Sequence, residues 1–381
     1  MKTEWVHKKL GDDDVAKIIM GQSPSSASYN DENIGLPFLQ GCADFGEVFP
    51  KTSVYCNEPL KVAPQNSILM SVRAPVGTIN KADQKYIIGR GLCSIVSLIN
   101  NDYLYYYLLQ NKNRLEQKAQ GSTFLAINSE EVNDFDVSYP ESLSTQRRIA
   151  AILTSADKVI AATQKTIAKY KQIKQGMMED LLNEQCTMNN VQWRKVKLGE
   201  CCESELGKTL DEGRNTGLYR PYLCALNVLW GKIDRSTIKR MRIEDSELER
   251  YLVKKGDLLV CEGGEIGRCA IWDYDDVIYY QNALHRVRFY DGYDARFFMY
   301  LLCHYNDLKL IEQYGKGLTI KHLNQTAFRN IPVCVPDLAA QRRIAAILSG
   351  IDAKIAAEEK VLEKYTLVKK GLMEKLLNDN K

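Results

Sequence analysis

The segment QRRIAAIL occurs twice in the chain, at residues 146–153 and again at residues 341–348. When each copy is extended, two 38-residue segments, 146–183 and 341–378, align without a gap and share 22 identical residues. Chance does not produce this degree of identity, so the pair indicates an internal duplication. The duplication sets the plan of the chain, because both segments are expected to form the same structure.

Fainter matches lie upstream of each copy. WVHKKLG at 5–11 resembles WRKVKLG at 193–199, and GSTFLAINSEEVNDFDVSYP at 121–140 resembles GLTIKHLNQTAFRNIPVCVP at 317–336. The offset between the copies drifts from 188 to 196 residues, so the loops differ in length. We therefore expect four parts, which are a globular unit at 1–140, a helix at 141–186, a second globular unit at 187–336 and a second helix at 337–381.

Apolar residues in the duplicated segments recur three and four positions apart, which is the spacing of a helix with one apolar seam. Polar residues interrupt this seam at Thr163 and Lys174 in the first copy and at Glu358 and Lys369 in the second. We expect their neighbours Ile173 and Val368 to fill the interruptions. The expected seam residues are Ile149, Leu153, Ile160, Ile167, Tyr170, Met177 and Leu181 in the first copy and Ile344, Leu348, Ile351, Ile355, Leu362, Tyr365, Leu372 and Leu376 in the second.

The two seams are the natural partners of each other. A helix of about 40 residues is roughly 60 Å long and cannot bury its seam alone, so we expect an antiparallel coiled coil. The expected fold class is mixed α/β, with two globular α/β units separated by the two long paired helices in a pseudo-two-fold symmetric arrangement. The alternative is two separate surface helices, each packed on its own unit. The shared seam, the shared length and the prolines before each helix, Pro140 and Pro336, argue against it.

Composition favours a cytoplasmic protein without a metal site. The 381 residues are 45% hydrophobic and 26% charged, and no run of about 20 apolar residues predicts a membrane span. The N-terminal segment MKTEWVHKKLGDDD is too polar for a signal peptide. Eleven cysteines without a CxxC pair fit reduced thiols better than a disulfide framework. His285, His304 and His322 form no metal-binding pattern.

The charge is distributed unevenly along the chain. The formal net charge is +3, and it divides into −3 for residues 1–140 and +2 for each of the other three parts. An autonomous DNA-binding domain is often far more basic. The acidic first unit therefore counts against nucleic-acid binding by charge alone.

The globular units are predicted to be mixed α/β with short strands. NSILMSV at 66–72 and GDLLVCEG at 256–263 are apolar strands that end in turns. Segments 102–119 and 294–314 predict amphipathic helices, with Tyr107 aligned to Tyr300. We expect the aromatic residues of these helices in the core rather than as stacking platforms for bases.

No catalytic motif stands out in the sequence. GGEIGRC at 263–269 lacks the Lys-Ser/Thr of a phosphate loop and is expected to be a hairpin turn. The pair Cys201 and Cys202 has no evident histidine partner that would activate a nucleophile. The sequence therefore predicts a protein that is not an enzyme.

The repeat of a variable unit followed by a QRRIAAIL helix resembles the specificity subunit of type I restriction-modification systems. The resemblance spans nearly the whole chain, and its most specific parts are the helical segments 146–182 and 341–377. GDLLVCEGGEIGRCAIW at 256–272, QNALHRVRF at 281–289 and GSTFLAIN at 121–128 also look like segments of target recognition domains.

The resemblance implies a function for each part. Each globular unit would be a target recognition domain that reads one half of a bipartite site in double-stranded DNA. The helices would fix the spacer and dock two modification (methyltransferase) subunits, and restriction (endonuclease and translocase) subunits would join them. S-adenosylmethionine, ATP and Mg are expected on those partner subunits, so this chain would hold no cofactor and catalyse no reaction.

Two other functions fit parts of the sequence. A coiled-coil adaptor that binds two copies of a protein partner and no DNA would need the same repeat, and the acidic first unit favours it slightly. A self-sufficient DNA methyltransferase would need a motif of the Asn/Asp-Pro-Pro-aromatic kind, and NEPL at 57–60 does not qualify.

Basic and hydroxyl side chains near turns are the natural candidates for contacts with phosphates and guanine. The Arg pairs that open each helix, Arg147–Arg148 and Arg342–Arg343, could instead cap the helix and form ion pairs, or contact a modification subunit. The candidate DNA contacts are Arg73, Lys81, Arg90, Ser122 and Thr123 in the first unit and Arg235, Lys239, Arg240, Arg242, Arg268, Arg286, Lys316, Thr319 and Lys321 in the second.

Overall fold

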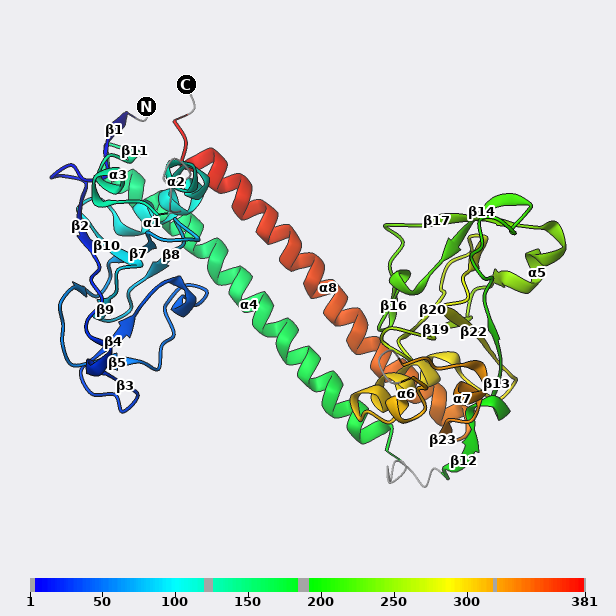
Figure 1. Ribbon diagram of the computed structural model, residues 1–381. Coiled ribbons are helices and arrows are strands. Elements are labelled where there is room, and N and C mark those ends of the chain that lie inside the picture. Colours follow the sequence, from blue (N-terminus) through cyan, green and yellow to red (C-terminus); the bar gives the residue numbers. More distant parts are fainter. Residues whose placement is uncertain (1–3, 120–125, 184–191, 318–320, 380–381) are drawn as a thin grey trace. The chain divides into compact units, whose positions relative to one another are not determined.

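The computed structural model describes residues 4–119, 126–183, 192–317 and 321–379. The chain divides into two compact units. Unit 1 comprises residues 1–164 and 360–381, and unit 2 comprises residues 165–359 (Figure 1). Each unit therefore contains one globular domain and half of each of two long helices.

The globular domain of unit 1 is built from three sheets and three short helices in the described residues. The sheets have the strand orders β1-β11, β2-β10-β7-β8 and β3-β5-β4-β9-β6. The elements are β1 (Trp5–Lys9), β2 (Ala16–Met20), β3 (Tyr29–Asn30), β4 (Leu36–Leu39), β5 (Tyr55–Cys56), β6 (Val62–Ala63), β7 (Ile68–Ser71), β8 (Ile79–Lys81), β9 (Tyr86–Ile88), β10 (Leu92–Ser97), α1 (Asn101–Gln110), α2 (Lys112–Ala119), α3 (Ser129–Asn133) and β11 (Asp136–Pro140).

The globular domain of unit 2 follows the same plan. Its sheets have the strand orders β12-β23, β13-β22-β19-β20, β17-β14-β21-β18 and β15-β16. The elements are β12 (Arg194–Lys197), β13 (Cys202–Leu206), β14 (Leu218–Leu223), β15 (Val228–Leu229), β16 (Lys232–Ile233), β17 (Lys239–Ile243), α5 (Leu248–Tyr251), β18 (Leu252–Val253), β19 (Leu258–Cys261), β20 (Cys269–Ile271), β21 (Ile278–Tyr280), β22 (Leu284–Phe289), α6 (Ala295–Asp307), α7 (Gln325–Arg329) and β23 (Pro332–Val335).

Two sheets of one domain correspond to two sheets of the other in the order and direction of their shared strands. β2-β10-β7-β8 matches β13-β22-β19-β20, and both are antiparallel throughout. In the second large sheet β4 pairs antiparallel with β5 and parallel with β9, as β14 pairs with β17 and β21. The faint sequence matches outside the helices therefore reflect one shared topology.

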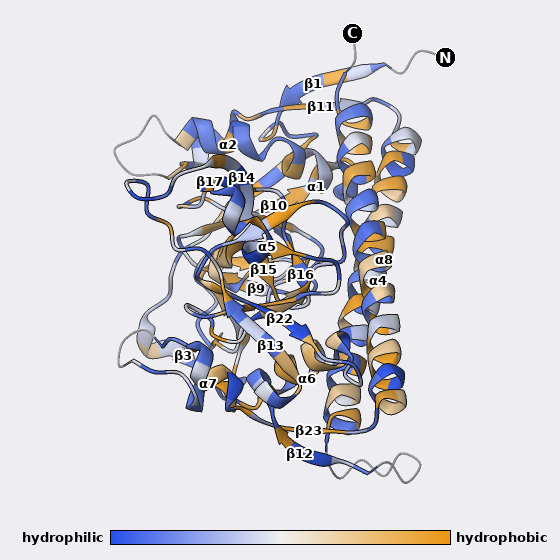
Figure 2. Cartoon of the chain, turned by 90° about the vertical axis from the view of Figure 1, so that its right-hand side faces the viewer, coloured by the Kyte–Doolittle hydropathy of each residue, from blue (hydrophilic) through white to orange (hydrophobic). Residues whose placement is uncertain are grey.

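The duplicated segments form two long helices, α4 (Leu143–Leu181) and α8 (Leu338–Leu376), which lie side by side (Figures 1 and 2). In unit 1 Lys369 Nζ lies 2.5 Å from Asp157 Oδ1, and in unit 2 Lys174 Nζ lies 2.7 Å from Asp352 Oδ1. The late part of each helix thus meets the early part of the other. The helices are therefore antiparallel within each unit, as the sequence predicts.

Most of the predicted seam faces the partner helix or a domain core. Its fully buried members are Ile149, Leu153, Ile167, Leu181, Ile344, Leu348, Ile351 and Ile355. Apolar and polar residues alternate along both helices (Figure 2). Tyr365 is a wrong prediction, since 39% of it is exposed. With only one partner helix to cover the seam, a large ring at its margin keeps contact with solvent.

The prediction that Ile173 and Val368 fill the polar interruptions is also wrong. Their exposed fractions are 40% and 44%, so they point away from the seam. The interruptions need no filling, because the ammonium groups of Lys174 and Lys369 pair with carboxylates on the opposite helix. The aliphatic part of a lysine can cover apolar surface while its charged end finds a partner.

Each long helix starts against one domain and ends against the other. Leu153 belongs to the core of unit 1, while Leu181 and Leu182 belong to the core of unit 2. Leu348 belongs to the core of unit 2, while Leu377 is buried in unit 1. This arrangement contradicts the alternative of two separate helices, each packed only on its own domain.

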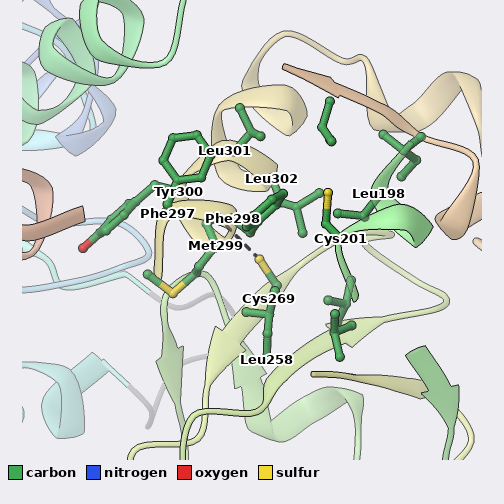
Figure 3. Close-up of a cluster of buried hydrophobic side chains, with 14 of the residues drawn as sticks. Leu198, Cys201, Leu258, Cys269, Phe297, Phe298, Met299, Tyr300, Leu301 and Leu302 are labelled. Carbon is green, nitrogen blue, oxygen red and sulfur yellow. Dashed lines mark hydrogen bonds between the residues drawn. The ribbon is translucent and has the colours of Figure 1, made fainter. Parts of the chain in front are cut away.

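The largest core in unit 2 packs α6 against the sheet that contains β19 and β20. Figure 3 shows Phe297, Phe298 and Leu302 gathered over Cys269 and Leu258. Cys201 and Cys202 are fully buried here, where they act as small apolar residues. The predicted hairpin turn at 263–269 is confirmed, since β19 and β20 pair directly across it.

None of the helices that the structure describes combines the length and the apolar character that a membrane span requires.

The first residue of the repeated octapeptide fastens each helix to its domain. Gln146 is 2% exposed; its amide donates to Pro140 O at 2.8 Å and accepts from Asn100 N at 2.9 Å. Gln341 repeats this, donating to Pro336 O at 2.8 Å and accepting from Asp294 N at 2.9 Å. An amide can donate and accept at once, which explains a buried glutamine here.

These contacts also correct the alignment of the domain helices. Because Asn100 and Asp294 are equivalent, Tyr300 corresponds to Tyr106 rather than to Tyr107. The predicted alignment of Tyr107 with Tyr300 was therefore shifted by one residue. Runs of seven and six consecutive apolar or aromatic residues, at 103–109 and 297–302, offer no internal marker of register, whereas the contact with the long helix does.

A buried histidine makes unit 2 sensitive to acid. His285 is fully buried, its Nε2 donates to Leu323 O at 2.6 Å, and burial lowers its pKa to about 4. The pKa of a histidine in the unfolded chain is near 6.5. The contribution of the neutral His285 ring to the free energy of unfolding is therefore fully present above pH 6.5 and is lost as the pH falls toward 4. We expect this group alone to reduce the free energy of unfolding by about 3 kcal/mol over that range.

Urea unfolding followed by tryptophan fluorescence would measure this, since three of the four tryptophans, Trp193, Trp230 and Trp272, lie in unit 2. His285→Gln should flatten the dependence of stability on pH between 7 and 4, and the exposed-site control His322→Gln should leave it unchanged. Equal slopes for the His285→Gln variant and the unsubstituted protein would contradict the assignment.

Candidate nucleic-acid interface

An exposed basic ribbon covers one edge of the sheet β17-β14-β21-β18 in unit 2. In β17 the alternation of side chains buries Met241 and Ile243 and exposes Arg240 and Arg242. Successive strand residues point to opposite faces, so an alternating sequence gives one apolar and one basic face. The register pairs Tyr219 with Arg242 and Pro221 with Arg240 on the exposed face. We define the basic ribbon as Tyr219, Arg240 and Arg242.

The ribbon joins cationic groups to an exposed aromatic ring. The guanidinium of Arg242 lies 5.0 Å from the centre of the Tyr219 ring, and Arg240 donates to Tyr219 O at 2.9 Å. Tyr219 is 55% exposed. A positive strand edge with an accessible ring can contact phosphates, guanine edges or base faces.

A glycine permits the close pairing of the two strands. Gly217 precedes β14 with φ +92°, and a Cβ on it would lie 2.2 Å from Ile243 O. Gly35 precedes β4 in unit 1 with φ +91° and makes the equivalent approach to Cys56 O. Both domains therefore build this strand pair in the same way.

The equivalent ribbon of unit 1 carries different side chains. Leu36 pairs with Cys56 there as Leu218 pairs with Ile243 in unit 2. The next pair, which is Tyr219 with Arg242 in unit 2, is Pro37 with Tyr55 in unit 1. The same backbone position thus presents a cation and a ring in one unit and no charge in the other.

Arg235 and Lys239 lie near the ribbon and are both exposed. The Arg235 guanidinium stacks over Tyr274 at 4.4 Å and also pairs with Asp276. Arg235 is therefore held in place and already has an anionic partner. Lys239 is exposed at the start of β17, on the side of the strand that it shares with Met241 and Ile243.

Of the candidates in unit 1, Arg73 and Arg90 are exposed. Lys81 already has partners: its ammonium lies 2.7 Å from Asp102 Oδ1 and 4.2 Å from the centre of the Tyr105 ring. These contacts direct its side chain from β8 toward helix α1, and its contact with DNA stays a prediction. The further candidates Ser122 and Thr123 lie outside the described residues.

In unit 2 two arginines near turns have structural partners instead of open surface. Arg286 is 4% exposed; it donates to Leu252 O at 2.8 Å and lies 3.0 Å from Glu205 Oε2. Arg268 donates to Ala225 O at 2.8 Å and pairs with Glu265 at 3.1 Å. These side chains therefore hold parts of the domain together, and the contact of Arg286 and Arg268 with DNA stays a prediction.

The remaining candidates surround the loop before α7. Lys316 and Lys321 are exposed, and Lys321 donates to Glu312 O at 3.1 Å. His322 pairs by its backbone with both Lys316 and Gly263, which brings this loop to the β19–β20 turn. Thr319 lies outside the described residues. The ring of Tyr219, which sequence reasoning missed, becomes visible only through its pairing with Arg242.

The arginine pairs at the start of each long helix are exposed, and none of the four makes an ion pair within the described part of the chain. The expected capping and ion-pair role for Arg147, Arg148, Arg342 and Arg343 is thus not seen. Their guanidinium groups are accessible to another molecule.

Across the described ranges, no group of three or more His, Cys, Asp or Glu residues is arranged to hold a metal ion. A cavity of about 460 Å³ lies where α4 ends in unit 2, lined among others by Glu179, His304 and Tyr314. Burial lowers the pKa of His304, so this ring favours its neutral form.

The sequence matches the family described as type I restriction modification DNA specificity domain twice, over residues 2–172 and 190–366. The chain is 24% identical over 300 residues to the type I restriction enzyme MjaVIII specificity subunit of Methanocaldococcus jannaschii, with 74% of this chain and 70% of that protein covered. It is 41% identical over 182 residues to a protein described as the MjaX specificity subunit of the same organism. That match covers 47% of this chain and 43% of the MjaX protein, so the chain spans less than half of it.

Two solved structures share the fold. A type I restriction-modification system S subunit from M. genitalium superimposes with a TM-score of 0.67 at 17% identity, covering 100% of this chain and 98% of that one. A chain from a study of complex assembly and conformational transition of the type I R-M system gives a TM-score of 0.62 at 16% identity, with 100% of both chains covered.

Proposed function

The chain belongs to the type I restriction modification DNA specificity family, the family of the non-catalytic specificity subunits, and we propose that its two domains read the two halves of a bipartite site in double-stranded DNA. The observation that carries the proposal is the contrast between shared scaffold and divergent surface. At the equivalent strand pair, unit 2 offers Tyr219 and Arg242 where unit 1 offers Pro37 and Tyr55. Two domains that share a fold but expose different side chains at the same position suit a DNA site whose two halves differ in sequence.

We propose target recognition domains at 1–140 and 187–336, joined by helical spacers at 141–186 and 337–381. Joining two weak readers by a stiff element makes the second contact intramolecular, which raises both affinity and selectivity. A paired helix fixes the distance between half-sites better than a flexible linker does. The cross-helix pairs of Lys174 with Asp352 and of Lys369 with Asp157 support a stiff spacer.

The exposed side of the long helices supports docking of protein partners. Along α4, Ile152, Val159 and Ile173 recur at multiples of seven and are 37%, 38% and 40% exposed. Val361 and Val368 continue the corresponding line on α8 and are 39% and 44% exposed. We define these five residues as the outer stripe. A heptad-spaced apolar stripe beside the seam suits further helices, and we propose that two modification subunits dock there and restriction subunits join them.

The chemistry of the complex would reside in those partners. We propose that S-adenosylmethionine, ATP and Mg bind the modification and restriction subunits, and that the complex works in the cytoplasm. A chain that only selects the site needs no cofactor of its own. The modest charge of unit 1 is compatible with this division of labour, since partner subunits can supply much of the contact with phosphates.

A gel shift with the modification subunits present tests the function against the adaptor alternative. Labelled duplexes would be selected from a random pool at low salt and sequenced. Recovery of a bipartite motif, one half of which changes when the unit 2 domain is exchanged for another, supports recognition. Absence of binding to any duplex at low salt would favour an adaptor that binds proteins only.

We expect Arg240→Ala and Arg242→Ala each to weaken binding of the selected duplex about tenfold, since one good bidentate contact contributes about 1–3 kcal/mol. A contact with a base should relax the preference at one position of the unit 2 half-site. A contact with phosphate should weaken all sequences equally and lower the salt slope by about one.

The matched control for these substitutions is Arg250→Ala. Arg250 is also an exposed arginine, but it lies in α5 at the opposite edge of the sheet, before β18. Fluorescence anisotropy at several salt concentrations measures all three variants. Equal affinities for Arg250→Ala and Arg242→Ala would remove the basic ribbon from the interface.

A further inference from the structure

Each long helix carries one aspartate that joins three elements of its unit. In unit 1, Asp157 of α4 accepts from the Tyr106 hydroxyl of α1 at 2.7 Å and lies 2.5 Å from Lys369 Nζ of α8. The tyrosine comes from the globular domain and the lysine from the opposite helix. Asp157 therefore touches the domain and both long helices.

Unit 2 repeats the arrangement with the helices exchanged. Asp352 of α8 accepts from the Tyr300 hydroxyl of α6 at 2.6 Å and lies 2.7 Å from Lys174 Nζ of α4. Figure 3 shows Tyr300 at the edge of the apolar cluster, with its hydroxyl oxygen directed away from the other side chains. The hydroxyl of a threonine or serine on the same helix donates to each tyrosine oxygen, Thr154 at 3.3 Å and Ser349 at 3.2 Å.

The chemistry of the tyrosine, the aspartate and the lysine suits a rigid connection between the domain and the two helices. We call this group of three residues in each unit the joint. Tyr106 and Tyr300 are each 2% exposed, and burial raises the pKa of both hydroxyls well above the ordinary value, so they stay protonated donors. A hydrogen bond to a carboxylate is shorter and stronger than a neutral one. Each lysine ammonium also lies over the tyrosine ring, Lys369 at 5.7 Å and Lys174 at 5.3 Å.

A nearby cross-helix pair shows what an ordinary contact looks like. Lys171 Nζ lies 3.1 Å from Glu359 Oε1, and the two side chains are 59% and 51% exposed. Exposed pairs of this kind contribute little to stability. Neither residue has a hydrogen bond or an ion pair to the globular domain among the described residues.

The aspartate is the second of two polar attachment points between each domain and its helix, beside the apolar packing of residues such as Leu153 and Leu348. The first is the buried glutamine, Gln146 or Gln341, which bonds the domain backbone. Each aspartate follows its glutamine by 11 residues, or about 16 Å along the helix. Two polar attachments at this separation restrict rotation of the domain about the shared apolar core more than one attachment does.

We propose that Asp157 and Asp352 are positioning residues that lock each reading domain onto the paired helices and thereby set how strictly the spacing between half-sites is enforced. The inference rests on the proposed function, because spacing matters only if both domains read DNA. A domain that pivots can reach half-sites one base pair too near or too far. A locked domain cannot, because the misplaced half-site lies outside its reach.

The test compares unit 2 variants in the complete complex with modification subunits. Tyr300→Phe removes the bond to the domain and leaves the ion pair, and Asp352→Asn removes the ion pair. The exposed-pair control is Glu359→Gln. Methylation rates are measured on duplexes with the preferred spacer and with spacers one base pair shorter and longer.

We expect both variants to keep the rate at the preferred spacer within about twofold and to lower the preference for it about tenfold, which is the effect of about 1.4 kcal/mol. Glu359→Gln should behave as the unsubstituted chain. Unchanged preference in Tyr300→Phe, or the same loss in Glu359→Gln, would overturn the inference. A lower melting temperature without a change in spacer preference would reduce the cluster to an ordinary stabilising contact and would also overturn it.

A readout without DNA separates this inference from the proposed function. Spin labels are introduced as non-natural amino acids at Glu249 in α5 and Ala353 in α8, both exposed and both in unit 2. The distance distribution between them should widen in Tyr300→Phe and stay narrow in Glu359→Gln. If the complex binds no DNA, the proposed function fails and the widened distribution still supports the joint; an unchanged distribution overturns the joint.

Discussion

Insertion of one heptad into both long helices is expected to abolish methylation of the original bipartite site and to create a preference for a longer spacer. Gln164 and Glu359 occupy the same position of the repeat, 195 residues apart. Duplication of residues 158–164 and 353–359 lengthens each helix by about 10 Å, the length of about three base pairs. Seven residues return the seam to within about 20° of its original face, so the helices can still pair.

The expected loss is large because two half-site contacts act together. When the second half-site is out of reach, its contribution through effective concentration disappears, and this contribution is commonly about 100-fold or more. We therefore expect methylation at the original spacer to fall at least about 100-fold. The two half-site sequences should stay the same, since the domains are untouched.

The measurement is methylome sequencing of cells that express the complex with either chain. A control chain carries Gln164→Ala and Glu359→Ala, which change the insertion points without changing the length. That control should keep the original spacer. A heptad-insertion chain that still methylates the original spacer would remove the role of the helices as a ruler.

The duplicated segments carried most of what the sequence could predict about the fold. Period and identity are local properties, so the length of each helix and its seam could be read directly from 146–183 and 341–378. The reciprocal packing of each helix end, such as Leu181 in unit 2 and Leu377 in unit 1, follows from an antiparallel pair of equal length. Among the predicted seam residues, the prediction was wrong for Tyr365, which is exposed because a single partner helix cannot bury every residue of the seam.

The interruptions of the seam were interpreted wrongly for a reason that is not local. From the sequence, Lys174 and Lys369 are polar residues in an apolar line, and an adjacent isoleucine or valine offers a simple remedy. In the structure each lysine is satisfied by an aspartate 178 or 212 residues away in the chain. Partners at such separations appear only after the two helices are placed together.

The candidate DNA contacts show the same limit more strongly. Arg286 and Arg242 look alike in the sequence, each lying in a short strand among apolar residues. Arg286 is buried by partners as distant as Glu205, and Arg242 is exposed beside Tyr219 because β17 is an edge strand. Position within a sheet decides between a structural and a surface arginine, and the partners that bury Arg286 lie outside its own strand.

Glutamate substitutions in the outer stripe are expected to separate partner docking from helix pairing. Ile173 and Val368 are equivalent in the repeat and exposed in the structure. If they filled the seam, Ile173→Glu and Val368→Glu would unfold the paired helices. Because they point outward, we expect the melting temperature of the isolated chain to change by no more than a few degrees, as for ordinary surface substitutions.

The effect on assembly should be much larger. A docked partner would bury both new carboxylates without a counter-charge, and burying an unpaired charge costs several kcal/mol. We therefore expect the affinity for the modification subunits to fall about 100-fold or more, and methylation with it. Binding is measured by analytical ultracentrifugation of the chain mixed with modification subunits, and stability by thermal melting of the chain alone.

The matched control is Ala161→Glu with Ala356→Glu. These two positions are also equivalent in the repeat and exposed, but at 100° per residue they lie on the opposite flank of the seam from the outer stripe. Loss of assembly only in the outer-stripe variant would place the partners on that flank. If both variants assemble normally, the modification subunits bind elsewhere. The exposed arginine pairs at Arg147–Arg148 and Arg342–Arg343, which are repeated on both helices and accessible, then become the next surface to test.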